Sequence, residues 1–182
     1  MGNLIEYTLI SVDGVYTDPA GLGFMRYRDD AYLRDGLGVL CACDAMIMGR
    51  GFYDSSAKLW TSRPAHPWAH RLNAMTKYVF SSTLTAPEWH NCIVVNGDVT
   101  SEAARLKQET NGDLLIWGHT RLANTLMREG LVDFIELSIH PLLVGHGGLL
   151  IRDGLNMSLR LLSTKSFSNI VKLTYQVEPA GE

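Results

Sequence analysis

Short apolar runs alternate with amphipathic segments through the first two-thirds of the chain. The runs are rich in Val, Ile, Leu and aromatic residues, as buried strands are, and they cover residues 4–12, 45–48, 77–81, 92–95 and 114–117. Helical periodicity and capping residues predict helices between them, at about residues 29–43, 52–59, 100–110 and 120–130.

The last third of the chain has a different pattern. Apolar and polar residues alternate at 135–139 and 171–177, a further strand is predicted at 159–164, and residues 167–169 predict a hairpin turn between the last two. Strand–helix alternation followed by strands alone predicts an α/β fold with a mostly parallel sheet, flanking helices and an antiparallel C-terminal hairpin. No repeat or linker interrupts the pattern, so we expect a single domain over residues 1–182.

Two segments show neither the helical nor the alternating strand pattern. Glycine and proline predict a loop at residues 17–27, and two prolines predict an irregular segment at 60–73. His66 and His70 have the i,i+4 spacing of helical metal ligands, but Pro67 and the lack of a third ligand argue against a metal site. The adjacent carboxylates at residues 29 and 30 are better explained by helix capping than as a catalytic pair.

Residues 113–122 join a buried strand to a helix through a glycine. Gly118 ends the strand, Thr120 can cap the helix, and Gly130 stands where a C-terminal glycine belongs. The first amides of a helix lack intrahelical partners, and with the helix dipole they favour a phosphate. Many such turns bind nothing, so this turn alone leaves both interpretations open.

A second glycine turn, Gly49-Arg50, follows the strand at 45–48. A guanidinium beside free helix amides suits a phosphate, because it is always charged and can bind two oxygens. The alternative is a surface arginine paired with a carboxylate.

Other polar side chains follow the ends of predicted strands. Asp13 is either a turn aspartate bound to its own backbone or a carboxylate that faces a ligand. Ser81, Ser82 and Thr83 place three hydroxyls after the strand at 77–81. In open α/β sheets, ligands lie beyond the carboxyl ends of the strands, so we expect these residues and both glycine turns to converge there.

Composition narrows the classes of partner. The net charge of −3 without a basic run argues against nucleic acid. No apolar run reaches the roughly 18 residues of a membrane-spanning helix, and no secretory signal is evident. The three cysteines, without CxxC spacing, fit reduced thiols better than disulfides or zinc, which predicts a cytoplasmic protein.

Several motifs in one order resemble the dihydrofolate reductase-like superfamily. The matching motifs are Ser11-Val-Asp-Gly14, Met48-Gly-Arg50 with Tyr53, Lys77-Tyr-Val with Ser81 and Thr83-Leu84, Trp89, Gly118 with Leu122, Gly130-Leu-Val-Asp133, and Pro141 with Gly145 and Gly147. The branch most similar to this chain is the reductase domain of the bifunctional riboflavin-biosynthesis deaminase/reductase, with its stand-alone bacterial relatives. The resemblance implies an eight-stranded mixed sheet, NADPH as hydride donor and a homodimer.

The resemblance also implies roles for individual positions. Gly49 and Arg50 would meet the cofactor phosphates, with Arg50 near the 2′-phosphate. The adenosine-ribose side would be lined by Ser81, Ser82 and Thr83, and the pyrophosphate would be held by Gly118, His119, Thr120, Arg121 and Leu122. The substrate would be bound by Asp13, Tyr16, Trp60 and Gly145, with Asp13 as the candidate acid.

The chain departs from the family pattern at several points. Gly51 and Phe52 stand where Lys or Arg and then Thr usually follow the Gly-Arg turn, and His119 replaces a small or hydroxyl residue. The first helix has no clear counterpart of the acidic residue that serves the pterin, which makes folate doubtful as a substrate. No deaminase zinc motif is present, so only the reductase-like half is expected.

These observations predict an NADPH-dependent reductase. It would transfer hydride to a C=N or C=O group of a small polar substrate that is pteridine-, pyrimidine- or ribosyl-like. The alternative, motivated by Phe52 and His119, is a non-catalytic nucleotide- or flavin-binding module on the same fold.

Overall fold

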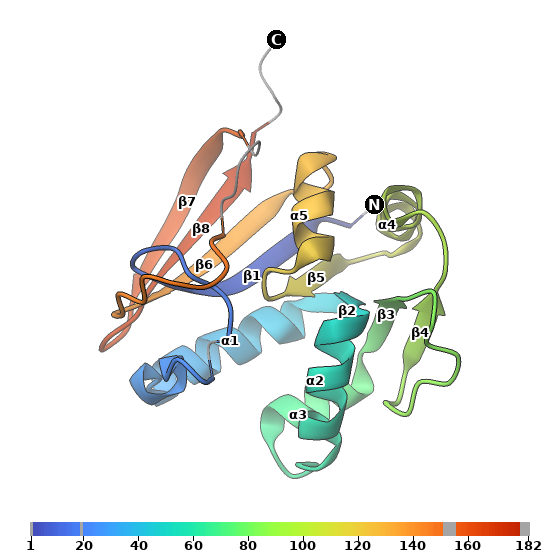
Figure 1. Ribbon diagram of the computed structural model, residues 1–182, viewed down its shortest axis with the longest axis horizontal. Helices are drawn as coiled ribbons and strands as arrows, with labels where there is room; N and C mark the ends of the chain where they lie inside the picture. Colours follow the sequence, from blue (N-terminus) through green and yellow to red (C-terminus); the bar gives the residue numbers. More distant parts are fainter. Residues whose placement is uncertain (1, 19, 151–155, 179–182) are drawn as a thin grey trace.

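The computed structural model describes residues 2–18, 20–150 and 156–178, and within these ranges eight strands form one sheet in the order β4-β3-β2-β5-β1-β6-β8-β7 (Figure 1). The strands are β1 (Leu4–Ser11), β2 (Cys43–Gly49), β3 (Thr76–Phe80), β4 (Cys92–Val95), β5 (Asp113–Trp117), β6 (Phe134–His140), β7 (Leu159–Ser166) and β8 (Val171–Val177). The helices are η1 (Phe24–Tyr27), α1 (Asp30–Ala42), α2 (Arg50–Thr61), α3 (Pro67–Ala74), α4 (Val99–Glu109) and α5 (Arg121–Arg128).

Strand direction follows the predicted division of the chain. The six strands from β4 to β6 pair in parallel, whereas β8 pairs antiparallel with both β6 and β7. The mixed sheet, its flanking helices and the antiparallel C-terminal hairpin are therefore confirmed.

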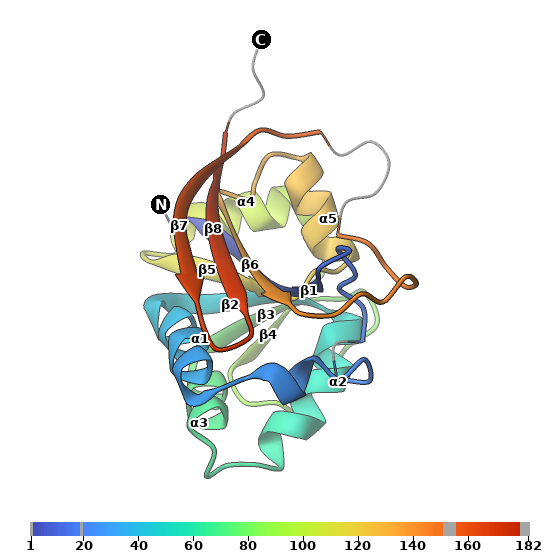
Figure 2. The ribbon, with the colours of Figure 1, turned by 90° about the vertical axis from the view of Figure 1, so that its left-hand side faces the viewer.

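Helices cover both faces of the parallel part of the sheet (Figures 1 and 2). One apolar cluster joins the sheet to α4 and α5, and a second joins it to α1, α2 and α3. In β5, Leu114 and Ile116 belong to the first cluster and Leu115 to the second. Both faces of this strand are buried, which is why its sequence is an unbroken apolar run.

Local capping explains most helix ends. Asp29 and Thr120 accept hydrogen bonds from the amides of Tyr32 and Ala123, as the sequence predicted. Gly130 has a φ of 66° and ends α5 in a Schellman motif, in which its amide bonds Met127 O at 3.0 Å and the next amide bonds Leu126 O.

Three boundaries differ from the prediction. The cap of α4 is Asp98, which accepts from Ser101 N, so the predicted cap at Thr100 or Ser101 is wrong. The segment predicted as irregular at 60–73 contains the end of α2 and most of α3. Pro67 begins α3 because the first turn of a helix does not need its amide. The predicted loop at 17–27 contains the short helix η1, and its position 19 lies outside the described residues.

A buried lysine joins α3 to β3. The Lys77 ammonium donates to Leu72 O at 2.6 Å and Met75 O at 2.7 Å, and it lies 4.9 Å from the centre of a Trp89 ring. Burial lowers the pKa of Lys77 from 10.5 to about 8.

This pKa predicts how the Lys77→Met variant will differ from the wild type. Between pH 8 and 10.5, the unfolded chain binds more protons at Lys77 than the folded protein does, so this residue's contribution to stability increases as pH rises. The unfolding free energy of the wild type minus that of Lys77→Met should therefore increase from pH 7.5 to pH 10, by at most about 1.4 kcal/mol per pH unit. Urea denaturation measures this difference, and a constant difference would contradict the prediction.

Candidate functional site

Parallel pairing places the ends of three strands at one edge of the sheet. Trp117 ends β5, and Gly49 is in register with Phe80, so β5, β2 and β3 end side by side. Tyr7 of β1 is in register with Trp117, and β1 continues past this edge to Ser11. The two glycine turns are neighbours, because a Cβ added to Gly49 would lie 3.9 Å from the Cβ of Leu122. The starts of α2 and α5 therefore lie close together at this edge.

The turn from β5 to α5 is tied to β1. Gly118 has a φ of +79°, which favours glycine, and its amide donates to Tyr7 O at 2.7 Å. The amide of His119 donates to the hydroxyl of Thr8 at 2.6 Å. Thr120 caps α5, whose first free amides follow at Arg121 and Leu122.

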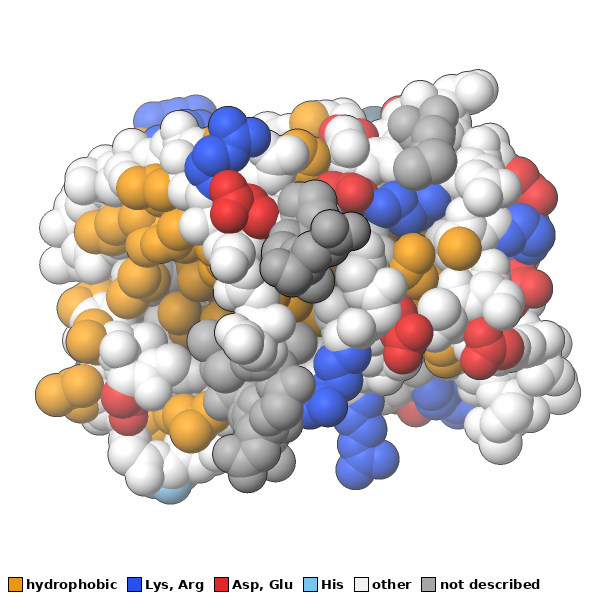
Figure 3. Space-filling view, turned by 90° about the horizontal axis from the view of Figure 1, so that it is seen from above, with side chains coloured by type: hydrophobic (Ala, Val, Ile, Leu, Met, Phe, Trp, Pro, Cys, Tyr) orange, Lys and Arg blue, Asp and Glu red, His pale blue; other side chains and the backbone are white. Residues whose placement is uncertain are grey.

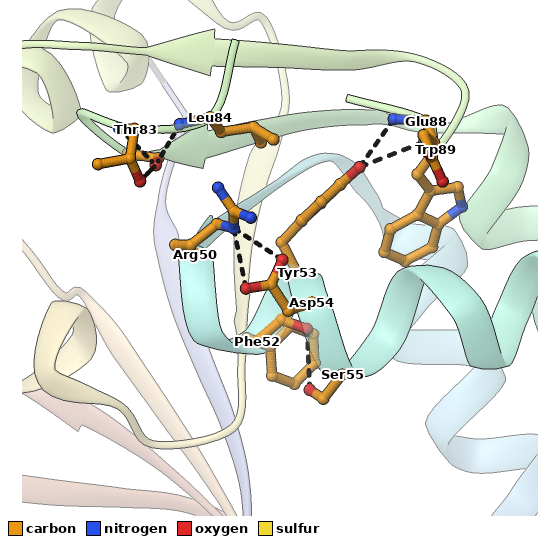
Figure 4. Close-up of polar contacts among 10 residues, drawn as sticks. Arg50, Phe52, Tyr53, Asp54, Ser55, Thr83, Leu84, Glu88 and Trp89 are labelled. Atoms are coloured by element: carbon orange, nitrogen blue, oxygen red, sulfur yellow. Dashed lines mark hydrogen bonds and ion pairs between the residues drawn. The ribbon is translucent and has the colours of Figure 1, made fainter. Parts of the chain in front are cut away.

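Arg50 is the first residue of α2, and its cap, Gly49, has no side chain (Figure 4). The guanidinium Nε lies 2.7 and 2.8 Å from the two carboxylate oxygens of Asp54. Both side chains are exposed, at 42% and 51%, and such an i,i+4 pair contributes little stability. An incoming anion could therefore compete with Asp54 for the guanidinium.

A cavity of about 660 Å³ runs between α2 and the loop that joins β3 to β4, lined by Arg50, Tyr53, Asp54, Ala57, Lys58, Thr61, Leu84, Ala86, Glu88, Trp89 and His90. The Tyr53 hydroxyl accepts from the amide of Glu88 at 2.8 Å and so holds this loop against α2 (Figure 4). Ser81 uses its hydroxyl to accept from the amides of Thr83 and Leu84, while Ser82 and Thr83 are exposed. These three hydroxyl residues shape the turn beside the cavity but do not line it.

A mostly apolar cavity of about 290 Å³ lies at the end of β5 and beside the second half of β1, lined by Thr8, Leu9, Tyr16, Thr17, Asp18, Phe52, Trp117, Gly118, His119 and Thr120. Behind Trp117, the rings of Trp60 and Trp68 lie 6.1 and 5.2 Å away, centre to centre. Trp60 therefore supports the wall of this cavity through Trp117. Planar, rigid walls of this kind suit a flat heterocycle.

A third cavity, of about 540 Å³, follows the exposed side of α5. Its wall consists of Tyr16, His119, Thr120, Arg121, Asn124, Thr125, Arg128 and Leu149. Tyr16, His119 and Thr120 line both this cavity and the apolar one, so they form the boundary between the two.

Asp13 is enclosed by hydrogen-bond donors. Its carboxylate accepts from the Ser11 hydroxyl at 2.5 Å, from Gly145 N at 2.6 Å and from Val144 N at 3.1 Å. The Ser11 hydroxyl, followed by the amides of Gly145 and Val144, lowers the pKa of Asp13 to about 2. Near neutral pH this carboxyl group has no proton to donate, and both Asp13 and Gly145 are occupied in fixing a loop to the end of β1.

That loop reaches the cavities through its next residues. Tyr16 N donates to Gly148 O at 3.0 Å, and Gly148 N donates to the hydroxyl of Thr17 at 3.0 Å. Asp13 therefore positions Tyr16 indirectly, through the backbone of the loop that Asp13 holds.

Sequence analysis missed Glu6, a carboxylate within the apolar β1. Glu6 is wholly buried, and its Oε1 lies 2.7 Å from Nδ1 of His119, which is 6% exposed. The edge of the Tyr16 ring packs on His119, with ring centres 4.7 Å apart. The available signal was an acidic residue at an inward position of a buried strand, where an unpaired charge is rarely tolerated.

The described residues contain no group of three or more His, Cys, Asp or Glu side chains placed to share a metal ion. Among the helices in the described ranges, none combines the length and hydropathy that crossing a bilayer requires.

Comparison with solved structures shows the same fold in proteins with low sequence identity. A candidate riboflavin biosynthesis protein of Shewanella sp. PV-4 superposes with a TM-score of 0.73 at 19% identity, covering 97% of this chain and 99% of that one. A pyrimidine reductase-like protein of Corynebacterium diphtheriae gives 0.64 at 16%, covering 98% and 92%.

A Thermotoga maritima diaminohydroxyphosphoribosylaminopyrimidine deaminase/5-amino-6-(5-phosphoribosylamino)uracil reductase gives a TM-score of 0.69 at 12% identity. The match covers 97% of this chain but only 56% of that protein. The present chain therefore corresponds to about half of the bifunctional protein.

Sequence comparison identifies relatives and the family. The uncharacterized proteins YwjB and YyaP of Bacillus subtilis (strain 168) are 31% identical over 133 residues and 32% identical over 106 residues. The match with YwjB covers 72% of this chain and 72% of YwjB. The match with YyaP covers 57% of this chain and 56% of YyaP, little more than half of its length. The model of the RibD C-terminal domain family matches residues 4–173, and the chain therefore belongs to this family.

Proposed function

We propose that this protein is an NADPH-dependent reductase that acts on a C=N or C=O group of a small polar substrate, pteridine-, pyrimidine- or ribosyl-like. The observation that carries the proposal is the adjacency of two glycine–helix turns at one sheet edge, with a cavity of mixed polarity beside α2 and an aromatic cavity beside Gly118. The names of two structural relatives, one of which includes a uracil reductase, support the same chemistry.

The residues at this edge fit an extended dinucleotide. The cavity beside α2 has room for the adenosine part, with Arg50 at its end as the partner of a 2′-phosphate. The amides that begin α5 suit the pyrophosphate, and the aromatic cavity suits the nicotinamide ring and the substrate. Bound NADPH supplies a hydride.

The chain's own contribution is binding, orientation and exclusion of water. Trp117 and Phe52 supply apolar walls that limit solvent around the reacting carbon. Asp13 holds the loop that places Tyr16 at the cavity, so it acts on the substrate side as a positioning residue.

A second candidate is a non-catalytic nucleotide- or flavin-binding module. It is favoured by the Phe52 ring, which lies 3.7 Å from where a Cβ of Gly118 would stand and so narrows the approach to the turn. Tight nucleotide binding without NADPH oxidation across a panel of carbonyl and imine compounds would favour this candidate, and a yellow purified protein would indicate flavin.

We also propose a homodimer formed through the antiparallel end of the sheet. The side chains of β7 are exposed, including Leu161 at 53% and Leu162 at 46%. Hydrophobic side chains gather at the end of the molecule where β7 and β8 lie (Figure 3). A second copy of the chain would bury this surface, as large exposed apolar patches usually require.

The cofactor assignment predicts the behaviour of Arg50→Gln. Loss of the guanidinium should weaken NADPH binding about tenfold, or roughly 1.4 kcal/mol, and leave NADH binding nearly unchanged. Quenching of tryptophan fluorescence, with Trp117 at the cavity, measures both affinities. Arg105→Gln, on the exposed surface of α4, is the matched control. If the wild-type protein binds neither nucleotide, the proposed cofactor and activity are both wrong.

The surroundings of Asp13 predict a loss of turnover in Asp13→Asn with little change in NADPH affinity. The amide side chain no longer attracts the amides of Val144 and Gly145 as a carboxylate does, so the loop loses its anchor. Because the pKa of Asp13 is about 2, the wild-type rate should show no titration of this group above pH 4. Asp44→Asn, at the opposite end of β2, is the control; equal turnover in the wild type and Asp13→Asn would remove Asp13 from the mechanism.

The dimer predicts that Leu161→Glu will shift the protein toward monomer. A charge at this position of β7 would be buried without a partner in the interface. Sedimentation equilibrium at micromolar concentration measures the mass, with Ser163→Glu, an exposed and already polar position of the same strand, for comparison. A wild-type mass equal to one chain would rule the dimer out.

A further inference from the structure

Glu6 and His119 form a buried pair beneath the start of α5. The Glu6 side chain is wholly inaccessible, and among the described residues the only polar contact of its carboxylate is that of Oε1 with His119 Nδ1, at 2.7 Å. Its second oxygen, Oε2, is buried without a hydrogen bond in the same part of the chain. A lone buried carboxylate is costly. The pair is therefore stable when one proton is added to ionised Glu6 and neutral His119, which makes the pair neutral overall.

The His119 ring is fixed in orientation. Its backbone amide is bound to Thr8, its Nδ1 faces Glu6, and the edge of Tyr16 packs against it. The ring nevertheless lines the cavities on both sides of the turn. The remaining ring nitrogen, Nε2, has no hydrogen bond to any described residue, so it can donate to a ligand at the start of α5.

The charge of the pair depends on a single proton. With its proton it is neutral and offers an N–H donor; without it, the ionised Glu6 and neutral His119 carry one negative charge. The other ionisable groups around His119 are Tyr16 and Asp18 in the loop after β1 and Arg121 and Arg128 on α5. Ordinary tyrosine, aspartate and arginine side chains do not change charge between pH 5.5 and 8.5, whereas histidine does.

We propose that the Glu6–His119 pair is a proton-linked contact for an anionic phosphate group of the bound nucleotide. His119 donates from Nε2 to the phosphate, and Glu6 acts through His119 as a positioning residue that keeps the proton on the ring. Loss of the proton leaves a negative charge next to the phosphate, so nucleotide binding weakens as pH rises. This inference rests on the proposed nucleotide site, and it adds a pH response that Arg50, always charged, cannot provide.

The test is NADPH titration by tryptophan quenching between pH 5.5 and 8.5 at constant ionic strength. In the wild type the affinity should fall with rising pH, with a limiting slope of about tenfold per pH unit for one linked proton. Glu6→Gln/His119→Gln retains a neutral hydrogen-bonding pair and should lose this slope. Ionisation of NADPH itself is common to all variants and cancels in the comparison.

One single variant separates positioning from packing, and two histidine variants serve as controls. Glu6→Gln should move the fall in affinity to lower pH, because an amide favours the protonated ring less than a carboxylate does. A merely structural role for Glu6 would weaken binding equally at every pH.

His70→Gln, on the exposed surface of α3, should match the wild type, and His90→Gln tests the histidine beside the α2 cavity. If His90→Gln removes the slope and the double variant keeps it, the inference is overturned.

The outcomes also separate this inference from the proposed function. NADPH binding with the same pH dependence in the wild type and the double variant would keep the cofactor assignment and overturn the proton linkage. If NADPH does not bind, inorganic pyrophosphate is the probe, followed through the imidazole ¹⁵N resonances of His119. Pyrophosphate binding that weakens with pH in the wild type alone would support the inference, and no response of His119 would overturn it. Glu6→Gln serves these comparisons if the double variant does not fold.

Discussion

Parallel pairing of β5 with both β1 and β2 is the constraint on which the rest of the site depends. Parallel strands end on the same side, so this pairing brings the Gly118 turn beside the Gly49 turn and above Thr8. Each turn starts a helix, and the first amides of both helices are directed at the same edge. Separate cavities lie beside the two turns, one against α2 and one against Gly118.

Two carboxylates near this edge have different tasks because their surroundings differ. Asp13 lies among donors and is held ionised, which makes it an anchor for the loop that carries Gly145. Glu6 has a single partner, and that partner borders both cavities at the α5 turn. Asp13, which follows β1, fixes the loop beside the cavities. Glu6, inside β1, acts in our proposal through His119 on the charge at the start of α5.

The antiparallel end of the sheet is the part proposed as a contact between copies. Among the described elements, no helix covers the α5 side of β8 and β7, and the side chains of β7 are exposed throughout. The edge that carries the glycine turns and the proposed contact between copies thus lie in different parts of one sheet. A change in association could occur without altering the residues at the glycine turns.

The sequence by itself determined features that depend on neighbouring residues: the strand runs, the caps at Asp29 and Thr120, the glycine end of α5 and the order of motifs that marks the family. It misplaced the cap of α4 and missed α3, because several nearby polar residues can cap and proline can begin a helix as well as interrupt one. Only the tertiary structure decided the distant partners of Asp13, 131 and 132 residues away, and the partner of Glu6, 113 residues away. A side chain's charge and contacts at such separations are set by strand register and burial, and no local pattern encodes them.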